Sequence, residues 1–156
     1  MTIEGNFSTG AKADAIEVVT ADHRAVEQLF TLLQATTVPQ DSDLRLDLGR
    51  RIVHDLTVHT TIEEQVLYPA VRRFVDGGDD LADRAVAEHQ TVKDLLGKLD
   101  SAVPDDAGFL PAFRELEEHV SRHVHEEETE LLPSLRDSVR GEVLYELGDA
   151  LLRAKS

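Results

Sequence analysis

The chain lacks cysteine altogether, and none of its 156 residues is a tryptophan. The absence of cysteine excludes disulfide scaffolds, Cys-ligated zinc sites, iron–sulfur clusters and thiol catalysis. It also fits a reducing compartment, so we expect a cytoplasmic protein.

Basic residues are scarce, because 16 lysines and arginines stand against 31 aspartates and glutamates, a formal net charge of −15. A field of this sign repels phosphate backbones and anionic lipids, so we expect neither a nucleic-acid partner nor a membrane partner. The chain also lacks a leader-like N-terminus and any run of ~20 apolar residues that could span a bilayer. We therefore expect a soluble protein that is a monomer or a weak homo-oligomer.

Strand-like alternation is absent as well, and apolar residues recur instead at steps of three and four, the period of a core-facing helix stripe. Residues 1–11 are small, polar and unpatterned, so we expect them to be disordered and residues 12–156 to form one domain. Short loops between long helices favour antiparallel neighbours. The predicted fold is all-α, an antiparallel up-down-up-down four-helix bundle with an additional short C-terminal helix. The predicted helices cover roughly residues 12–36, 42–75, 80–100, 110–138 and 141–154.

What the chain does contain is a repeated motif. The segments His59–Pro69 and His123–Pro133 both have the pattern H-x-x-x-E-E-x-x-L-x-P, and each is followed three residues later by an arginine, Arg72 or Arg136. A histidine and a glutamate four residues apart lie on one face of a helix, one turn apart. Each copy can therefore aim one imidazole and one carboxylate at a common point. The closing proline predicts a kink, a frayed turn or the end of the straight part of each helix.

The seven histidines differ in the helix face that they occupy. Four of them fall on core-facing stripes, one in each long helix, together with the first glutamate of each motif. Six buried ionisable groups at matched depth are costly unless a cation neutralises them. The sequence therefore predicts a metal site formed by His23, His59, Glu63, His89, His123 and Glu127.

The remaining polar residues near the motifs receive weaker predictions. His54 and His125 are expected to face solvent, whereas His119 flanks the stripe and could be a ligand, a donor to a ligand or a pocket-lining residue. The second glutamates of the motifs lie ~140° from the ligand face, so we expect surface salt links with Arg72 and Arg136. The residues concerned are Glu64 and Glu128, and Glu27 and Glu126 flank the stripe as possible minor ligands.

A ligand set of imidazole and carboxylate without thiolate suits non-haem iron, manganese or zinc. Two glutamates that can bridge, with histidines on both sides, favour two metal ions over one. Two iron ions are the leading prediction, and a purely structural zinc site is the alternative.

These motifs resemble the hemerythrin-like (HHE cation-binding) family over about residues 14–138. The resemblance rests on the Asp-His pair ending at His23, the Glu-His pair ending at His89, and the two H-x-x-x-E motifs. It implies an antiparallel four-helix bundle with a non-haem di-iron centre, oxo- or hydroxo-bridged when oxidised. In that centre the residues matching Glu63 and Glu127 bridge the irons, and those matching the four histidines are terminal ligands.

One departure from this family bears on function. Oxygen-carrying hemerythrins use five terminal histidines, two of them one turn apart on the third helix, but here Ala85 and Lys93 flank His89 at that spacing. Water, a nearby side chain such as His119, Glu126 or a tyrosine, or an open position could take the place of the missing imidazole. For the two tyrosines, Tyr68 and Tyr145, we expect core or interface packing rather than ligation.

An open or exchangeable position favours reaction over reversible oxygen storage. We therefore expect a protein that reacts with peroxide, O2 or nitric oxide, most sharply a catalase-like oxidoreductase that removes hydrogen peroxide. The alternative is an O2- or iron-binding or sensing module without turnover, so enzymatic activity stays open at this point.

Overall fold

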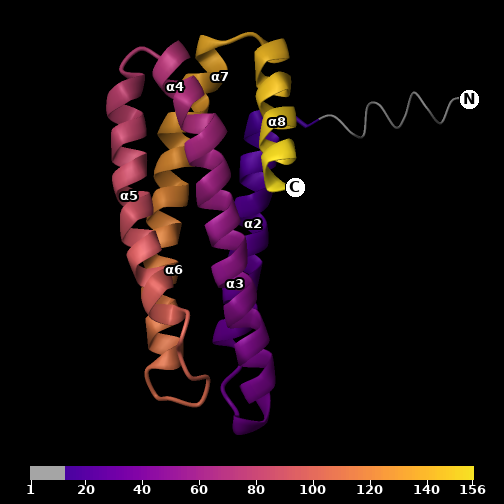
Figure 1. Ribbon diagram of the computed structural model, residues 1–156, viewed down its shortest axis with the longest axis vertical. Helices are drawn as coiled ribbons and strands as arrows, with labels where there is room; N and C mark the ends of the chain where they lie inside the picture. Colours follow the sequence, from indigo (N-terminus) through magenta and orange to yellow (C-terminus); the bar gives the residue numbers. More distant parts are fainter. Residues whose placement is uncertain (1–12) are drawn as a thin grey trace, which may run out of the picture.

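A computed structural model describes residues 13–156, and the prediction of disorder for residues 1–11 lies outside this range. Within it the chain forms helices and no strand, which confirms the predicted all-α bundle (Figure 1). The long helices are α2 (Ala15–Gln34), α3 (Ser42–Ile62), α5 (Gly78–Leu99), α6 (Phe109–Glu126) and α8 (Gly141–Lys155). The shorter elements are η1 (Pro39–Asp41), η2 (Glu63–Leu67), α4 (Tyr68–Phe74), η3 (Glu127–Leu131) and α7 (Leu132–Ser138).

Local signals set several of the helix ends. Asp14 and Glu17 form a capping box at the start of α2, so this helix begins three residues later than the predicted residue 12. The turn before α5 needs Gly77, whose φ is +72°. It also needs Gly78, because a Cβ atom there would lie 2.0 Å from the Val71 carbonyl oxygen.

The four long helices α2, α3, α5 and α6 form the bundle, and neighbours in the ring meet along four seams (Figure 1). These seams are α2–α3, α3–α5, α5–α6 and α6–α2. The two helices that carry the repeated motif, α3 and α6, lie at opposite corners. Their motifs can therefore meet only across the centre of the bundle.

Each motif contains a π-helical turn rather than the kink or frayed turn expected at the prolines. The Tyr68 N–H bonds to the Glu63 carbonyl, and the Leu132 N–H bonds to the Glu127 carbonyl, so each turn contains one extra residue. Pro69 and Pro133 follow at once and have no N–H to donate, and the wide turn accommodates them while the helix continues. Position 68 would lie ~140° from position 63 in a regular α-helix, and the π turn rotates it back toward the bundle centre.

The apolar core is divided into two clusters by a layer of polar side chains. One cluster joins α2 and η2 with α4, α7 and α8, and the other fills the opposite half of the bundle around Phe30, Phe113 and Leu116. The helix α8 packs on α2 and α3, and its Leu144 and Leu151 are buried against the bundle. Within residues 13–156, no helix is long and apolar enough to cross a membrane.

Candidate metal centre

The polar layer consists of the six residues predicted as metal ligands. Their side chains come from all four long helices and the two π turns, and every one of the six residues is between 0% and 6% exposed. They form two groups that share Glu63, and within each group the ligand atoms lie within 4.8 Å of one another. The first group is His23, His59, Glu63 and Glu127, and the second is Glu63, His89 and His123.

The two motif glutamates lie between histidines of opposite groups. Glu63 Oε1 lies 3.2 Å from His59 Nε2 and 3.0 Å from His89 Nε2. Glu127 places one oxygen 3.0 Å from His23 Nε2 and the other 3.3 Å from His123 Nε2. Each carboxylate therefore stands where it could bridge two cations.

The outer nitrogen of each of the four histidines faces a carboxylate on another element. The Nδ1···O distances are 2.8 Å for His59 and Asp22, 2.7 Å for His89 and Glu64, 2.7 Å for His23 and Glu128, and 2.6 Å for His123 and Glu88. A carboxylate at this distance holds the proton on Nδ1 and fixes the ring. All four Nε2 lone pairs are thus directed into the centre.

Several of the converging ring nitrogens and carboxylate oxygens lie close to one another without the geometry of a hydrogen bond. They are His23 Nε2, His59 Nε2, Glu63 Oε2 and Glu127 Oε1, all fully buried. The His89 and His123 Nε2 atoms, in addition, face each other at 3.2 Å. Buried acceptors left unpaired are destabilising, and metal cations would satisfy all of them at once. The residues present therefore fit a metal.

The pKa shifts of the metal-free site also indicate that it favours a cation. Burial by itself lowers the pKa of His59, but the carboxylates of Glu63 and Asp22 raise it to about 10. Burial would raise the pKa of Glu63, yet His59, His123 and His89 hold it well below its ordinary value. The centre therefore requires positive charge, and protons supply it when no metal is bound.

The salt links predicted for the second glutamate of each motif are present, but their partners are Lys93 for Glu64 and Arg24 for Glu128 instead of Arg72 and Arg136. Glu64 and Glu128 also accept hydrogen bonds from His89 and His23, which the sequence did not predict. Arg72 and Arg136 pair elsewhere, with Asp79, Asp83 and Asp137. Residues beside the core stripe face the neighbouring helix, so their partners come from that helix and are not visible in the local sequence.

Tyr68 packs in the core as expected, and its hydroxyl in addition points into the centre. Its hydroxyl lies 2.7 Å from Glu127 Oε2, 3.0 Å from His89 Nε2 and 3.3 Å from His123 Nε2. Burial and the two motif glutamates raise the pKa of Tyr68 well above its ordinary value, so its phenol keeps its proton in the metal-free protein. The signal that could have found this residue is the motif proline at position 69, which directly follows Tyr68 and the π turn.

The remaining candidates do not enter the centre. His54 and His125 are exposed as predicted, and Tyr145 is 45% exposed on α8. His119 is half-buried and belongs to neither group of candidate ligands, while Glu27 pairs with Arg24. The Tyr68 hydroxyl, by contrast, lies beside His89 and His123 within the centre.

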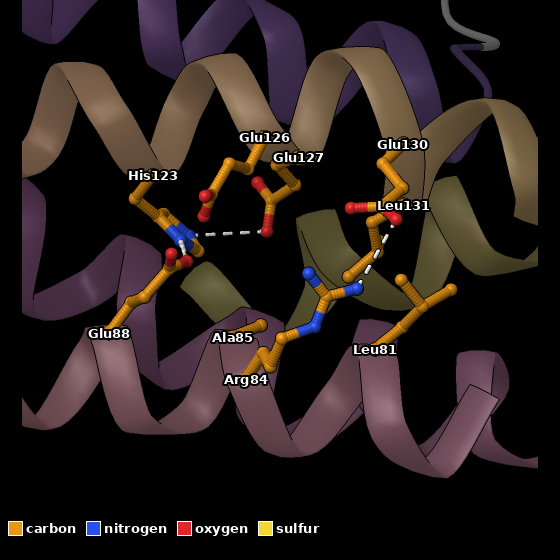
Figure 2. A pocket seen from close by; sticks show the side chains of 9 residues that line it. All are labelled: Leu81, Arg84, Ala85, Glu88, His123, Glu126, Glu127, Glu130 and Leu131. Atoms are coloured by element: carbon orange, nitrogen blue, oxygen red, sulfur yellow. Dashed lines mark hydrogen bonds and ion pairs between the residues drawn. The ribbon is translucent and has the colours of Figure 1, made fainter. Parts of the chain in front are cut away.

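Two cavities adjoin the centre. The first is a mainly apolar chamber inside the bundle. Its volume is about 20 Å³, so it admits one very small ligand. The second, the α5–α6 hollow, opens at the surface between α5 and α6–η3 (Figure 2). The chamber is lined by the four histidines with Asp22, Val26, Leu56, Thr60, Val92, Val120 and Val124, and the hollow by Leu81, Arg84, Ala85, Glu88, His123, Glu126, Glu127, Glu130 and Leu131.

Comparisons with known proteins show which family and fold this chain resembles. The family model described as the hemerythrin HHE cation binding domain matches residues 14–135. A DNA nickase of Nostoc sp. is 33% identical over 140 residues, which cover 90% of this chain and 38% of that protein, so the chain spans about two fifths of its length. An uncharacterised hemerythrin-like protein of Schizosaccharomyces pombe is 27% identical over 140 residues, 89% of this chain and 68% of that protein.

A similar fold occurs in the crystal structure of a hemerythrin HHE cation binding domain-containing protein from Mycobacterium kansasii. The TM-score is 0.78 at 24% identity, and the match covers 92% of this chain and 85% of the other. This likeness of fold supports the bundle described above.

Proposed function

The chain belongs to the hemerythrin HHE cation-binding family and is a metal-binding protein, and on that premise we propose that it holds two iron ions that react with hydrogen peroxide, O2 or nitric oxide. The single observation that carries this proposal is the convergence of four Nε2 atoms and two carboxylates, several of them buried and unpaired. Imidazole and carboxylate without thiolate form a donor set suited to iron.

We assign the six residues to two positions. His23 and His59 would hold one ion, His89 and His123 the other, and Glu63 and Glu127 lie between the two pairs. The Tyr68 hydroxyl lies beside His89 and His123, so it would be a further donor on that side only. The two ions would therefore have unequal surroundings.

The sharpest form of the activity is catalase-like, in which two molecules of hydrogen peroxide give O2 and two molecules of water. Iron supplies the redox change, since it exchanges electrons between its ferrous and ferric states. The chain's own groups restrict access, because the chamber beside the histidines has room for only one very small molecule and has valine and leucine walls. Carboxylates on Nδ1 keep each imidazole oriented.

Iron content and oxygen release test this proposal together. Iron-loaded wild-type protein should release one O2 for every two molecules of hydrogen peroxide consumed, measured with an oxygen electrode. Glu63→Ala and His89→Ala should lose both iron and turnover, and the exposed His125→Ala should keep them as the matched control. Unchanged turnover in Glu63→Ala and His89→Ala would refute the assignment.

A binding or sensing role without turnover is the second candidate. It is supported by the link from α8 to the centre, in which Lys155 bonds to one oxygen of Asp22 and the other oxygen faces His59 Nδ1 at 2.8 Å. Metal occupancy could then alter how α8 sits on the bundle. Melting temperature and oligomeric state, compared with and without iron, test this role, and identical values would remove its basis.

The expectations about partners and compartment extend this proposal. The Nostoc relative is named a DNA nickase, but the chain spans only 38% of it and has a net charge of −15, which disfavours DNA binding. We therefore propose a cytoplasmic protein, a monomer or weak homo-oligomer, whose ligands are small molecules. A gel-shift assay with duplex DNA at low salt would overturn this if it showed tight binding.

A further inference from the structure

The bonds from histidine to carboxylate form a closed ring around the bundle. Each bond crosses one of the four seams, so each seam contains one carboxylate at the level of the metal centre. These carboxylates are Asp22 between α2 and α3, Glu64 between α3 and α5, Glu88 between α5 and α6, and Glu128 between α6–η3 and α2.

Three of the four carboxylates are also paired with a basic side chain. Arg24 bonds to Glu128, Lys155 bonds to Asp22, and Lys93 bonds to Glu64 at 2.9 Å. Within residues 13–156, Glu88 has no lysine or arginine within 4.0 Å, and its carboxylate faces that of Glu126 (Figure 2). Among the described residues, the carboxylate of the α5–α6 seam is therefore the one without a lysine or arginine partner.

The α5–α6 hollow lies on this seam and leads down to the centre. Its inner residues are His123 and Glu127, two of the proposed ligands, and Figure 2 shows the Glu127 carboxylate pointing from η3 toward the space between the helices. Glu127 is 2% exposed, and its Oε1 atom has no hydrogen-bond partner. A buried acceptor of this kind at the bottom of an acidic hollow is a destination for a cation.

The outer part of the hollow is closed only by a surface ion pair. Arg84 Nη2 lies 3.2 Å from Glu130 Oε2, with both side chains more than half exposed (Figure 2). Exposed ion pairs of this kind contribute little stability, so they exchange easily with another cation. A divalent cation arriving at Glu130 can therefore displace the guanidinium.

The corresponding approach on the other side of the molecule is blocked. A shift of 64 residues relates Glu126 and Glu130 to Ile62 and Val66, which are buried or half-buried apolar residues of the core. The helix α8 lies over this side, on α2, α3 and η2 (Figure 1). The internal duplication thus offers two approaches, of which α8 covers one and acidic residues line the other.

We propose that the α5–α6 hollow is the passage by which a divalent cation such as Fe²⁺ reaches the metal centre. The cation meets Glu130 first, passes Glu126 and Glu88, and ends at His123 and Glu127. This inference rests on the proposed function, since it requires that the centre binds metal. It predicts that Glu126 and Glu130 govern how fast metal enters and not how much is held.

The experiment follows uptake of Fe²⁺ by metal-free protein under anaerobic conditions in a stopped-flow instrument, with a chelating dye reporting free iron. Glu126→Gln/Glu130→Gln should slow uptake by about 10-fold, the lower end of what electrostatic focusing by a charged cleft gives. Arg84→Ala should speed uptake because Glu130 is then free. The matched control is Glu115→Gln/Glu118→Gln, which removes the same charge from exposed positions of α6 and should leave the rate unchanged.

The outcomes separate this inference from the proposed function. Slower uptake with unchanged final iron content in the Glu126→Gln/Glu130→Gln protein supports the passage. Uptake as fast as in the wild type overturns it while leaving the metal centre intact, and so does an equal slowing in the control. Loss of bound iron at equilibrium also overturns it, because the two glutamates would then belong to the centre. A wild-type chain that binds no iron refutes the proposed function itself.

Discussion

The two copies of the motif have the same backbone and differ in the buried residue that directly follows the π turn. Both contain a histidine, a glutamate directed at the centre, a second glutamate on a neighbouring histidine, and a π turn before the proline. The first copy has Tyr68 where the second has Leu132, and both residues are 1% exposed. Leu132 packs in the apolar core, whereas the Tyr68 hydroxyl joins the polar layer. Duplication thus provides a nearly symmetrical set of donors, and the tyrosine adds a hydroxyl beside His89 and His123.

The largest expected effect comes from removing either of the two glutamates that lie between the histidine pairs. Glu63→Ala and Glu127→Ala should each reduce bound iron to below one ion per chain, because each carboxylate lies between histidines of both pairs. Metal analysis of protein purified with excess iron measures this. Equal and severe losses would confirm that the copies are equivalent at this position, and full iron content in either variant would contradict it.

The next effect tests the difference between the copies directly. Tyr68→Phe should weaken binding on the His89 and His123 side by about 10-fold, the lower end of the range for losing a group that supports a metal site. It should also change the visible spectrum of the iron-loaded protein. Titration with Fe²⁺ measures the two affinities separately.

The matched control for Tyr68→Phe is Tyr145→Phe, since Tyr145 is exposed on α8 and far from the centre in sequence and packing. If Tyr68→Phe weakens both metal positions equally, or neither, the asymmetry between the copies has another origin.

A smaller effect tests the residues that hold the histidines. Glu64→Gln and Glu128→Gln should each lower iron affinity by about 10-fold, because they remove the charge that fixes the Nδ1 proton of His89 or His23. Arg72→Ala and Arg136→Ala should have no such effect, because these arginines pair with surface aspartates. Lower iron affinity in the arginine variants and unchanged affinity in the glutamine variants would favour the pairing with Arg72 and Arg136 that the sequence suggested.

The smallest effect concerns pH and the metal-free protein. His59 keeps its proton up to a pKa of about 10 in the folded chain, compared with 6.5 in the unfolded chain. Its contribution to stability is therefore complete below pH 6.5 and is lost as the pH rises toward 10. Burial lowers the pKa of His123, but Glu127, Glu63 and Glu88 raise it well above its ordinary value. A histidine from each copy of the motif therefore contributes to this dependence of stability on pH.

Thermal unfolding of the metal-free protein between pH 6.5 and 9.5 checks this prediction. The midpoint should fall across this range, and the fall should be smaller in His59→Gln. A midpoint that stays constant or rises would show that the histidines of the metal-free centre are neutral.

Most of the fold and the six converging residues could be predicted from the sequence because both depend on helical periodicity. The stripe that buries Val19 and Val26 also buries His23 between them, so one pattern gives the core and the site. Two features could not be predicted from helical periodicity. Tyr68 reaches the centre only through a π turn, which changes the period, and Glu64 and Glu128 bond across seams whose partners depend on helix packing.

The position of α8 could be predicted only in part. Its amphipathic pattern indicated only that its apolar face needs a surface. The seam that it covers depends on close contact at Gly148, where a Cβ atom would lie 2.1 Å from the Ala13 carbonyl oxygen. Such an approach is a property of three-dimensional packing, and periodicity contains no information about it.

The measurement that tests the central claim most directly is the iron content of the wild-type chain, determined together with its optical spectrum after exposure to air. We predict two iron ions per chain and the charge-transfer absorption of a ferric pair, which zinc cannot produce. One metal ion per chain, or two ions of zinc with no visible absorption after loading with iron, would contradict the account.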